Sequence, residues 1–176
     1  MNPADVQEDL RRLLEEENIG YLCTSDSSGT PHIAPMFFYY SFDTHELFFI
    51  SDRKTRKVSN LLEVNSLAFT VDIRDRENPF NNRGVLLRGE LVKLTDLSME
   101  LSEKSRGALR LFSEKYQGFI DAKIPGESLI QVVEKGESAF IRSFQDVLVT
   151  VSIYKITYWK GPFSVVFDPE KIITPP

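Results

Sequence analysis

The strongest constraint on the fold is a series of short β-forming stretches that polar turns separate from one another. Apolar, β-branched and aromatic residues dominate six stretches, at residues 19–25, 31–40, 46–51, 66–75, 83–93 and 147–159. The turns between the early stretches are rich in Asp, Ser, Gly, Asn and Pro, which tight turns prefer. This spacing is typical of antiparallel barrels and sandwiches. We therefore expect a mainly β fold with six antiparallel strands.

Three helices are expected beside these strands. An Asn-Pro start and apolar residues at helical spacing predict a helix over residues 3–17. The same periodicity predicts helices over residues 54–65 and 96–116, the second with Asp96 as its N-terminal cap. Residues 117–145 show no clear pattern, and short helices and loops are expected there.

The length of 176 residues fits a single domain. We expect an N-terminal helix in residues 1–17, a barrel with inserted helices in residues 19–160, and a C-terminal extension in residues 161–176.

Composition excludes several classes of function. A net charge of −5 argues against a general nucleic-acid binder, and no apolar run approaches the ~20 residues that span a membrane. The single cysteine, Cys23, cannot form an internal disulfide, so a cytoplasmic location is expected. The two histidines, His32 and His45, have no cysteine or carboxylate cluster at ligand spacing, so no metal site is expected.

The segment from Ser51 to Lys57 carries the clearest chemical signal. It joins a predicted strand to a predicted helix, and four of its last five residues are cations. Cations are unfavourable at a helix N-terminus, where free N–H groups already carry partial positive charge. A bound phosphate, with a hydroxyl bond from Thr55 or Ser51, removes that conflict. The alternative is a solvated basic turn that Asp52 caps.

The order of these elements resembles the pyridoxamine 5′-phosphate oxidase-like, FMN-binding split-barrel superfamily. The resemblance covers about residues 5–95 and rests on three stretches: GTPHIAPMFFYY, ELFFISDRKTRKVSNLLEVNSLAFTVD and GVLLRGELVKL. It implies a six-stranded split β-barrel that binds FMN at the interface of a homodimer. The basic second-strand residue and the C-terminal substrate-phosphate signature of pyridoxamine 5′-phosphate oxidase itself are not recognisable. The resemblance therefore implies the superfamily rather than that particular reaction.

The cofactor-binding residues that the resemblance implies come from the second strand, the end of the third strand and the turn after it. They are His32, Ile33, Ala34, Pro35, Ile50, Ser51, Thr55, Arg56 and Lys57. Trp159 is a further candidate, because relatives often complete the partner's flavin site with a C-terminal aromatic or basic residue. Packing of Trp159 on the barrel end is the alternative. No catalytic acid or base stands out.

The aromatic run from Phe37 to Tyr40 bears on assembly. Strand alternation places these side chains on both faces, and a monomer can bury only one of them in its barrel. A homodimer is therefore expected to cover the other.

The leading function is an FMN-dependent oxidoreductase that acts on a small molecule, with the chemistry carried by the flavin. Three alternatives stay open: the same fold with a deazaflavin or haem, a flavin-binding sensor without turnover, and a structural dimer that binds no cofactor.

Overall fold

The computed structural model describes residues 2–117 and 146–172. The strands are β1 (Ile19–Ser25), β2 (Pro31–Phe37), β3 (Tyr39–Ser41), β4 (Glu46–Asp52), β5 (Ser66–Ile73), β6 (Arg83–Asp96), β7 (Asp146–Lys160) and β8 (Phe163–Phe167). The helices are α1 (Pro3–Glu16), α2 (Arg56–Glu63) and α3 (Glu103–Lys115), with the short 3-10 turns η1 (Pro79–Asn81) and η2 (Pro169–Lys171). The predicted region 117–145 falls almost entirely outside the described residues.

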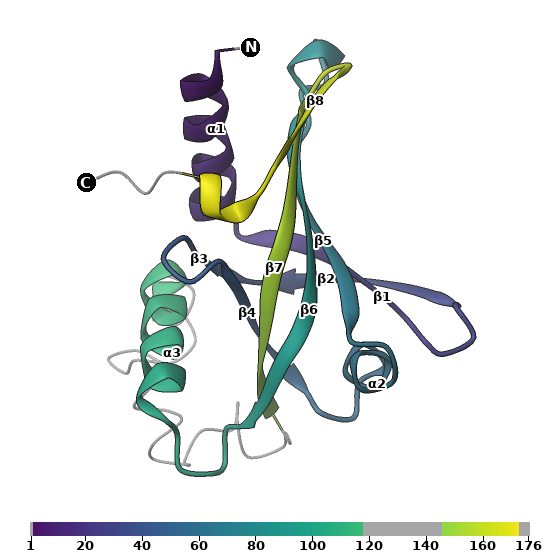
Figure 1. The fold of residues 1–176 in the computed structure, drawn as a ribbon, viewed down its shortest axis with the longest axis vertical. Helices are drawn as coiled ribbons and strands as arrows, with labels where there is room; N and C mark the ends of the chain where they lie inside the picture. Colours follow the sequence, from purple (N-terminus) through teal and green to yellow (C-terminus); the bar gives the residue numbers. More distant parts are fainter. Residues whose placement is uncertain (1, 118–145, 173–176) are drawn as a thin grey trace.

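All eight strands of the described residues belong to one twisted antiparallel sheet (Figure 1). Their order is β2-β1-β5-β6-β7-β4-β3, and β8 pairs with β7 beside that path. The mainly β, antiparallel prediction is confirmed. The structure has two strands more than the expected six, because the predicted strand 31–40 is divided in two and β8 forms in the segment predicted as a C-terminal extension.

The stretch Pro31–Ser41 belongs to both ends of this open sheet. Its first half, β2, pairs with β1, and its second half, β3, pairs with β4. Phe38 lies between the two halves, and its N–H donates a hydrogen bond to the Tyr116 hydroxyl (2.9 Å). That hydroxyl in turn donates to the Phe38 carbonyl (2.7 Å). The chain therefore joins the two ends of the sheet covalently, which produces a split barrel.

The inner face of the sheet encloses the main core. Phe38, Phe49 and Phe69 are completely buried there. Helix α1 covers one end with four buried apolar side chains at helical spacing, as its sequence predicts. Helix α2 contributes Val58 and Leu61 to the same core. The helices thus seal a barrel whose strands alone would leave apolar side chains in water.

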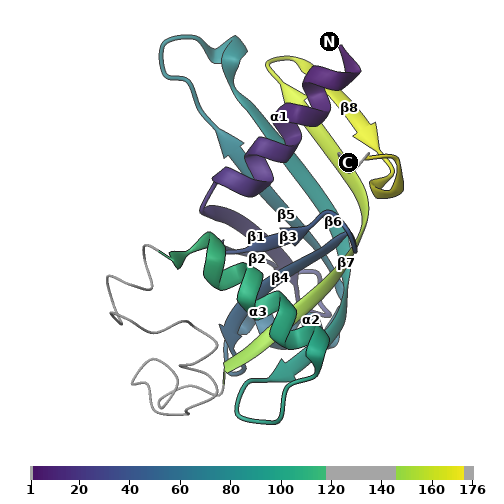
Figure 2. The same cartoon turned by 90° about the vertical axis from the view of Figure 1, so that its left-hand side faces the viewer.

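Helix α3 builds a second, smaller core on the opposite face of β4 and β7. Leu109 and Phe112 of α3 belong to one cluster with Phe48 of β4 and Leu148 of β7. Figure 2 shows α3 lying across these strands, below α1. Because β4 is covered on both faces, its first four residues are all buried.

This second core changes the interpretation of the aromatic run. Phe38 and Tyr40 point into the main core, as expected for one face of the strand. On the other face, Tyr39 stacks on Phe48, with ring centroids 6.3 Å apart, and packs against the α3 cluster. A helix of the same chain therefore covers a side chain that was expected to need a partner subunit.

The helix predicted over residues 96–116 begins later than expected. Asp96 is the last residue of β6, and its carboxylate accepts a hydrogen bond from the Ser98 N–H (2.9 Å) in the following turn. Ser102 caps α3 instead, because its side chain accepts from the Ser105 N–H. The apolar residues Leu97 and Leu101 fit a helical period but lie in the loop before α3. None of the helices in the described ranges has the length and apolar character that a membrane crossing needs.

Lys115 is a half-buried cation where α3 meets α1. Its Nζ donates to the Leu14 carbonyl (2.9 Å) and lies 3.8 Å from the centre of the Phe38 ring. Burial lowers the pKa of Lys115 to about 8, although Glu17 and Glu15 oppose that change. Between about pH 8 and pH 10 the unfolded chain therefore holds a proton that the folded chain has lost.

The free energy of unfolding is expected to rise across this pH range, because the unfolded state binds more protons there. In a Lys115→Met variant the rise should be smaller by about 1 kcal/mol, a value discounted for the partial exposure of the ammonium group. Urea unfolding at pH 7, 8, 9 and 10 measures it. An equal rise in both proteins would show that the proton belongs to another group.

Candidate functional site

The turn between β4 and α2 is held in shape by hydrogen bonds around Asp52. Its Oδ1 accepts the Lys54 N–H (2.7 Å), and its carbonyl accepts the N–H and the hydroxyl of Thr55 (3.1 and 2.7 Å). The Ser51 and Thr55 hydroxyls lie 3.0 Å apart. Because the Thr55 hydroxyl turns back to Asp52, it does not cap α2. The first N–H groups of this helix therefore have no side-chain cap, as an anion site requires.

Two of the four cations in this turn form ion pairs with distant carboxylates. Arg53 lies 3.4 Å from Asp96, and Arg56 lies 3.6 Å from Asp26. The hydrogen bond from the Ser28 side chain is the main cause that lowers the pKa of Asp26, so this partner stays charged. Both arginine side chains are about half exposed, and such pairs are weak and easily exchanged for another anion.

Lys57 differs from the other three cations of the turn because its side chain is half-buried and theirs are exposed. Burial lowers its pKa, and the charge of Asp52 only partly opposes that effect. Within residues 2–117 and 146–172 Lys57 forms no ion pair. A desolvated cation without a close counter-charge is costly, and a phosphate beside it would offset that cost.

Helix α2 also attaches the turn to the hairpin of β1 and β2. Asn60 is buried, and its Nδ2 donates to the Thr24 hydroxyl (3.1 Å). Glu63 accepts a hydrogen bond from the Ser27 N–H in the hairpin turn (3.1 Å). Thr24 lies directly opposite His32 in the strand register. The structure therefore brings the cationic turn and the predicted residues of β2 to the same end of the barrel.

The four predicted residues of β2 lie on two different faces of the strand. His32 and Ala34 share the inner face with Thr24 and are half-buried. Ile33 and Pro35 are on the outer face and exposed, Ile33 by 64%. Since side chains alternate along a strand, one flat ring can lie against only one of these pairs.

The remaining predicted residues lie at opposite ends of the sheet. Ile50 and Ser51 lie near the end of β4, where Ser51 pairs with Val147 at the start of β7. Trp159 is near the far end of β7, twelve residues further, which is roughly 40 Å at the usual rise per residue. Within one subunit, Trp159 therefore cannot share a ligand with the cationic turn.

Two polar residues of this region were not among the predicted site residues. Asp26, the partner of Arg56, lies in a turn whose sequence indicates only a turn. Asn60 could have been noticed as an amide among the apolar positions of the predicted helix 54–65.

The chain is thus a split barrel: an open, twisted antiparallel sheet whose two ends the stretch 31–41 joins, with an uncapped cationic turn at one end. A family model described as pyridoxamine 5′-phosphate oxidase matches residues 6–133, and the chain belongs to this family. The identification from the sequence is thereby confirmed. Proteins of this family bind FMN and are commonly dimers. No curated protein matches this sequence.

Solved structures show the same fold at low sequence identity. A heme-binding protein from Mycobacterium smegmatis has a TM-score of 0.66 and 11% identity over 94% of this chain, which spans 58% of that protein. An F420 reductase has a TM-score of 0.52 and 20% identity, with 83% of this chain and 94% of that one covered. A protein related to general stress protein 26 of B. subtilis, from Clostridium acetobutylicum, has a TM-score of 0.61 and 14% identity, covering 96% and 98%.

Proposed function

We propose that the chain binds FMN through its phosphate at the turn Ser51–Lys57, and that the bound flavin oxidises or reduces a small molecule. The observation that carries the proposal is Lys57, a half-buried ammonium group beside an uncapped helix N-terminus. The Ser51 and Thr55 hydroxyls can donate hydrogen bonds to the same phosphate. The guanidinium of Arg56 can do so as well by exchanging its weak ion pair with Asp26 for the phosphate.

The chemistry in this proposal belongs to the cofactor. FMN would supply the electron or hydride transfer, while the chain binds the flavin, orients it and limits its contact with water. A flavin-binding sensor would use the same residues, and turnover distinguishes it from an oxidoreductase.

The outer face of β1 and β2 supports a homodimer. Ile19, Tyr21 and Ile33 expose 48%, 45% and 64% of their surface there. Cross-strand pairs place Tyr21, Thr70, Leu86 and Thr157 in one row on this face of the sheet. Trp159 is two residues after Thr157 on β7, so its side chain lies on the same face. We call it the β1–β2 apolar face. Pairing two copies through this face would bury it and let Trp159 of one subunit approach the other subunit.

Removing the charge of Lys57 tests the phosphate site. A Lys57→Met variant is expected to bind FMN roughly 10- to 100-fold more weakly, the range for one charged hydrogen bond. Riboflavin has no phosphate, so its affinity should be weaker in the natural chain and unchanged in the variant. Titration of flavin fluorescence with apoprotein measures both constants.

Lys54→Met is the matched control, because Lys54 lies in the same turn but is exposed. Its FMN affinity should change by no more than a few-fold. Equal losses for FMN and riboflavin in Lys57→Met would place the phosphate elsewhere.

Haem or the deazaflavin F420 is the second candidate, and the heme-binding and F420-reductase structures favour it. Haem would need an axial ligand. His45 is in a turn, with its Nδ1 3.3 Å from the Tyr40 hydroxyl, and His32 is half-buried on β2. The visible spectrum of freshly purified protein distinguishes a flavin from haem, and a colourless protein that FMN does not restore would contradict both.

A further inference from the structure

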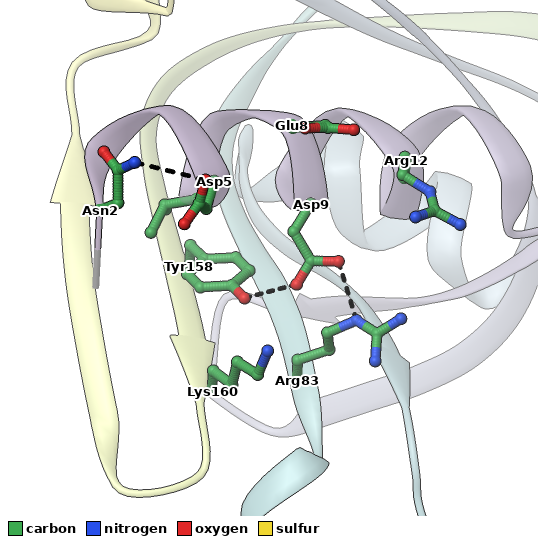
Figure 3. Close-up of a pocket in the computed structure, with 9 residues that line it drawn as sticks. Asn2, Asp5, Glu8, Asp9, Arg12, Arg83, Tyr158 and Lys160 are labelled. Atoms are coloured by element: carbon green, nitrogen blue, oxygen red, sulfur yellow. Dashed lines mark hydrogen bonds and ion pairs between the residues drawn. The ribbon is translucent and has the colours of Figure 1, made fainter.

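A polar pocket of about 450 Å³ lies between α1 and the sheet, far from the cationic turn. One wall is the first half of α1, and the other is formed by the start of β6 and the end of β7 (Figure 3). Its lining residues are Asn2, Asp5, Val6, Glu8, Asp9, Arg12, Arg83, Tyr158 and Lys160. Pockets of this size accept small molecules rather than single ions.

The pocket has a fixed centre at Asp9. The Tyr158 hydroxyl donates to Asp9 Oδ2 (2.6 Å), and Arg83 Nε lies 2.9 Å from Asp9 Oδ1. Burial and the bond to Asp9 raise the pKa of Tyr158, so its hydroxyl remains a donor. These contacts join α1, β6 and β7 and give the pocket walls a defined separation.

The sheet wall presents cationic groups to the pocket. Lys160 forms no ion pair within the described ranges, and Figure 3 shows its ammonium pointing toward Tyr158 and Asp9. The two terminal nitrogens of Arg83 are turned away from Asp9 in the same view. Both groups can therefore donate to a carboxylate or phosphate of a ligand.

The helix wall has a net negative charge, because its one cation, Arg12, pairs with Glu16 (3.3 Å). Asp5 and Glu8 line it, and neither forms an ion pair in the part of the chain that the structure describes. Among the described residues, the Asp5 carboxylate accepts one long hydrogen bond, from the Asn2 side chain (3.4 Å). A purely anionic ligand would be repelled by this wall, and a purely cationic ligand by Lys160 and Arg83.

We infer that this pocket binds a small zwitterion, with its carboxylate or phosphate on Arg83 and Lys160 and its ammonium group on Asp5, while Glu8 adds negative charge from the same helix. Within one subunit the pocket and the cationic turn are separate sites, since most of the length of β7 lies between them.

Trp159 provides a reporter for this site. It is the only tryptophan of the chain, and on β7 it stands between Tyr158 and Lys160 with its side chain on the opposite face of the strand. The purified full chain would be titrated with γ-aminobutyrate and phosphoethanolamine, and with butyrate and butylamine as singly charged controls. Calorimetry and tryptophan emission would follow binding. At least one zwitterion is expected to bind roughly tenfold more tightly than either control. Tighter binding of γ-aminobutyrate would identify a carboxylate as the preferred anionic group, and tighter binding of phosphoethanolamine would identify a phosphate.

Lys160→Met tests the location of binding. The side chain is exposed, so the fold should survive, and zwitterion affinity should fall roughly tenfold. Lys93→Met, an exposed lysine of β6 outside the pocket, should leave affinity unchanged. Binding that Lys160→Met does not weaken would overturn the assignment, as would the absence of zwitterion binding or equal binding of the singly charged controls.

Discussion

Replacing Ile33 with aspartate is expected to convert a homodimer into a monomer. Ile33 is the most exposed apolar side chain of the β1–β2 apolar face, and we propose that a second copy buries it. The variant would place an unpaired carboxylate inside that interface. Burial of such a charge costs several kcal/mol, so the dimer dissociation constant should rise by about 100-fold or more.

Sedimentation at micromolar concentration measures this change. The natural chain should sediment at about twice its mass of 20.2 kDa, and the variant at about that mass. The variant should remain folded, because Ile33 lies on an exposed strand face. FMN affinity should fall as the dimer is lost, since each proposed flavin site includes both subunits.

Met99→Asp is the matched control for this experiment. Met99 is 69% exposed in the turn before α3, away from the β1–β2 apolar face, so this variant should stay dimeric. A natural chain that is monomeric and still binds FMN tightly would contradict both the interface and the shared site.

Local sequence patterns predicted the strands and the cationic turn because their causes are local. Alternation and turn chemistry act over a few residues, and the conflict between cations and a helix start lies within Ser51–Lys57. The start of α3 was misplaced because a long-range strand pairing, which the local pattern does not show, decides where β6 ends. Leu97 and Leu101 are buried with a helical spacing, but the strand pairing of Asp96 with Val147 extends β6 up to that point.

Long-range packing explains what the sequence could not predict. Tyr39 is covered by a helix that begins more than sixty residues later, and nothing near Tyr39 indicates that contact. Likewise, Asp9 of α1 contacts Arg83 of β6 and Tyr158 of β7, which are far apart in the sequence. Each residue alone is an ordinary charged or aromatic position, so the pocket becomes visible only when the fold places α1 on the sheet.

The second large effect is expected in the main core, at Phe69. This ring is completely buried and lies 4.9 Å from the ring of Phe38, the residue that links the two ends of the sheet. It also covers Gly20, where any side chain would collide with it. Phe69→Ala removes these contacts and leaves a cavity that the surrounding strands can only partly fill.

Phe69→Ala is expected to lower the free energy of unfolding by about 3–5 kcal/mol, measured by urea denaturation. Phe69→Leu should cost less because it keeps most of the apolar volume, and it provides a measurable variant if the alanine protein does not fold. Phe80→Ala makes the same change at a side chain that is 70% exposed, and should shift stability by less than about 0.5 kcal/mol. Equal losses at Phe69 and Phe80 would mean that the barrel interior is not the core that stabilises this fold.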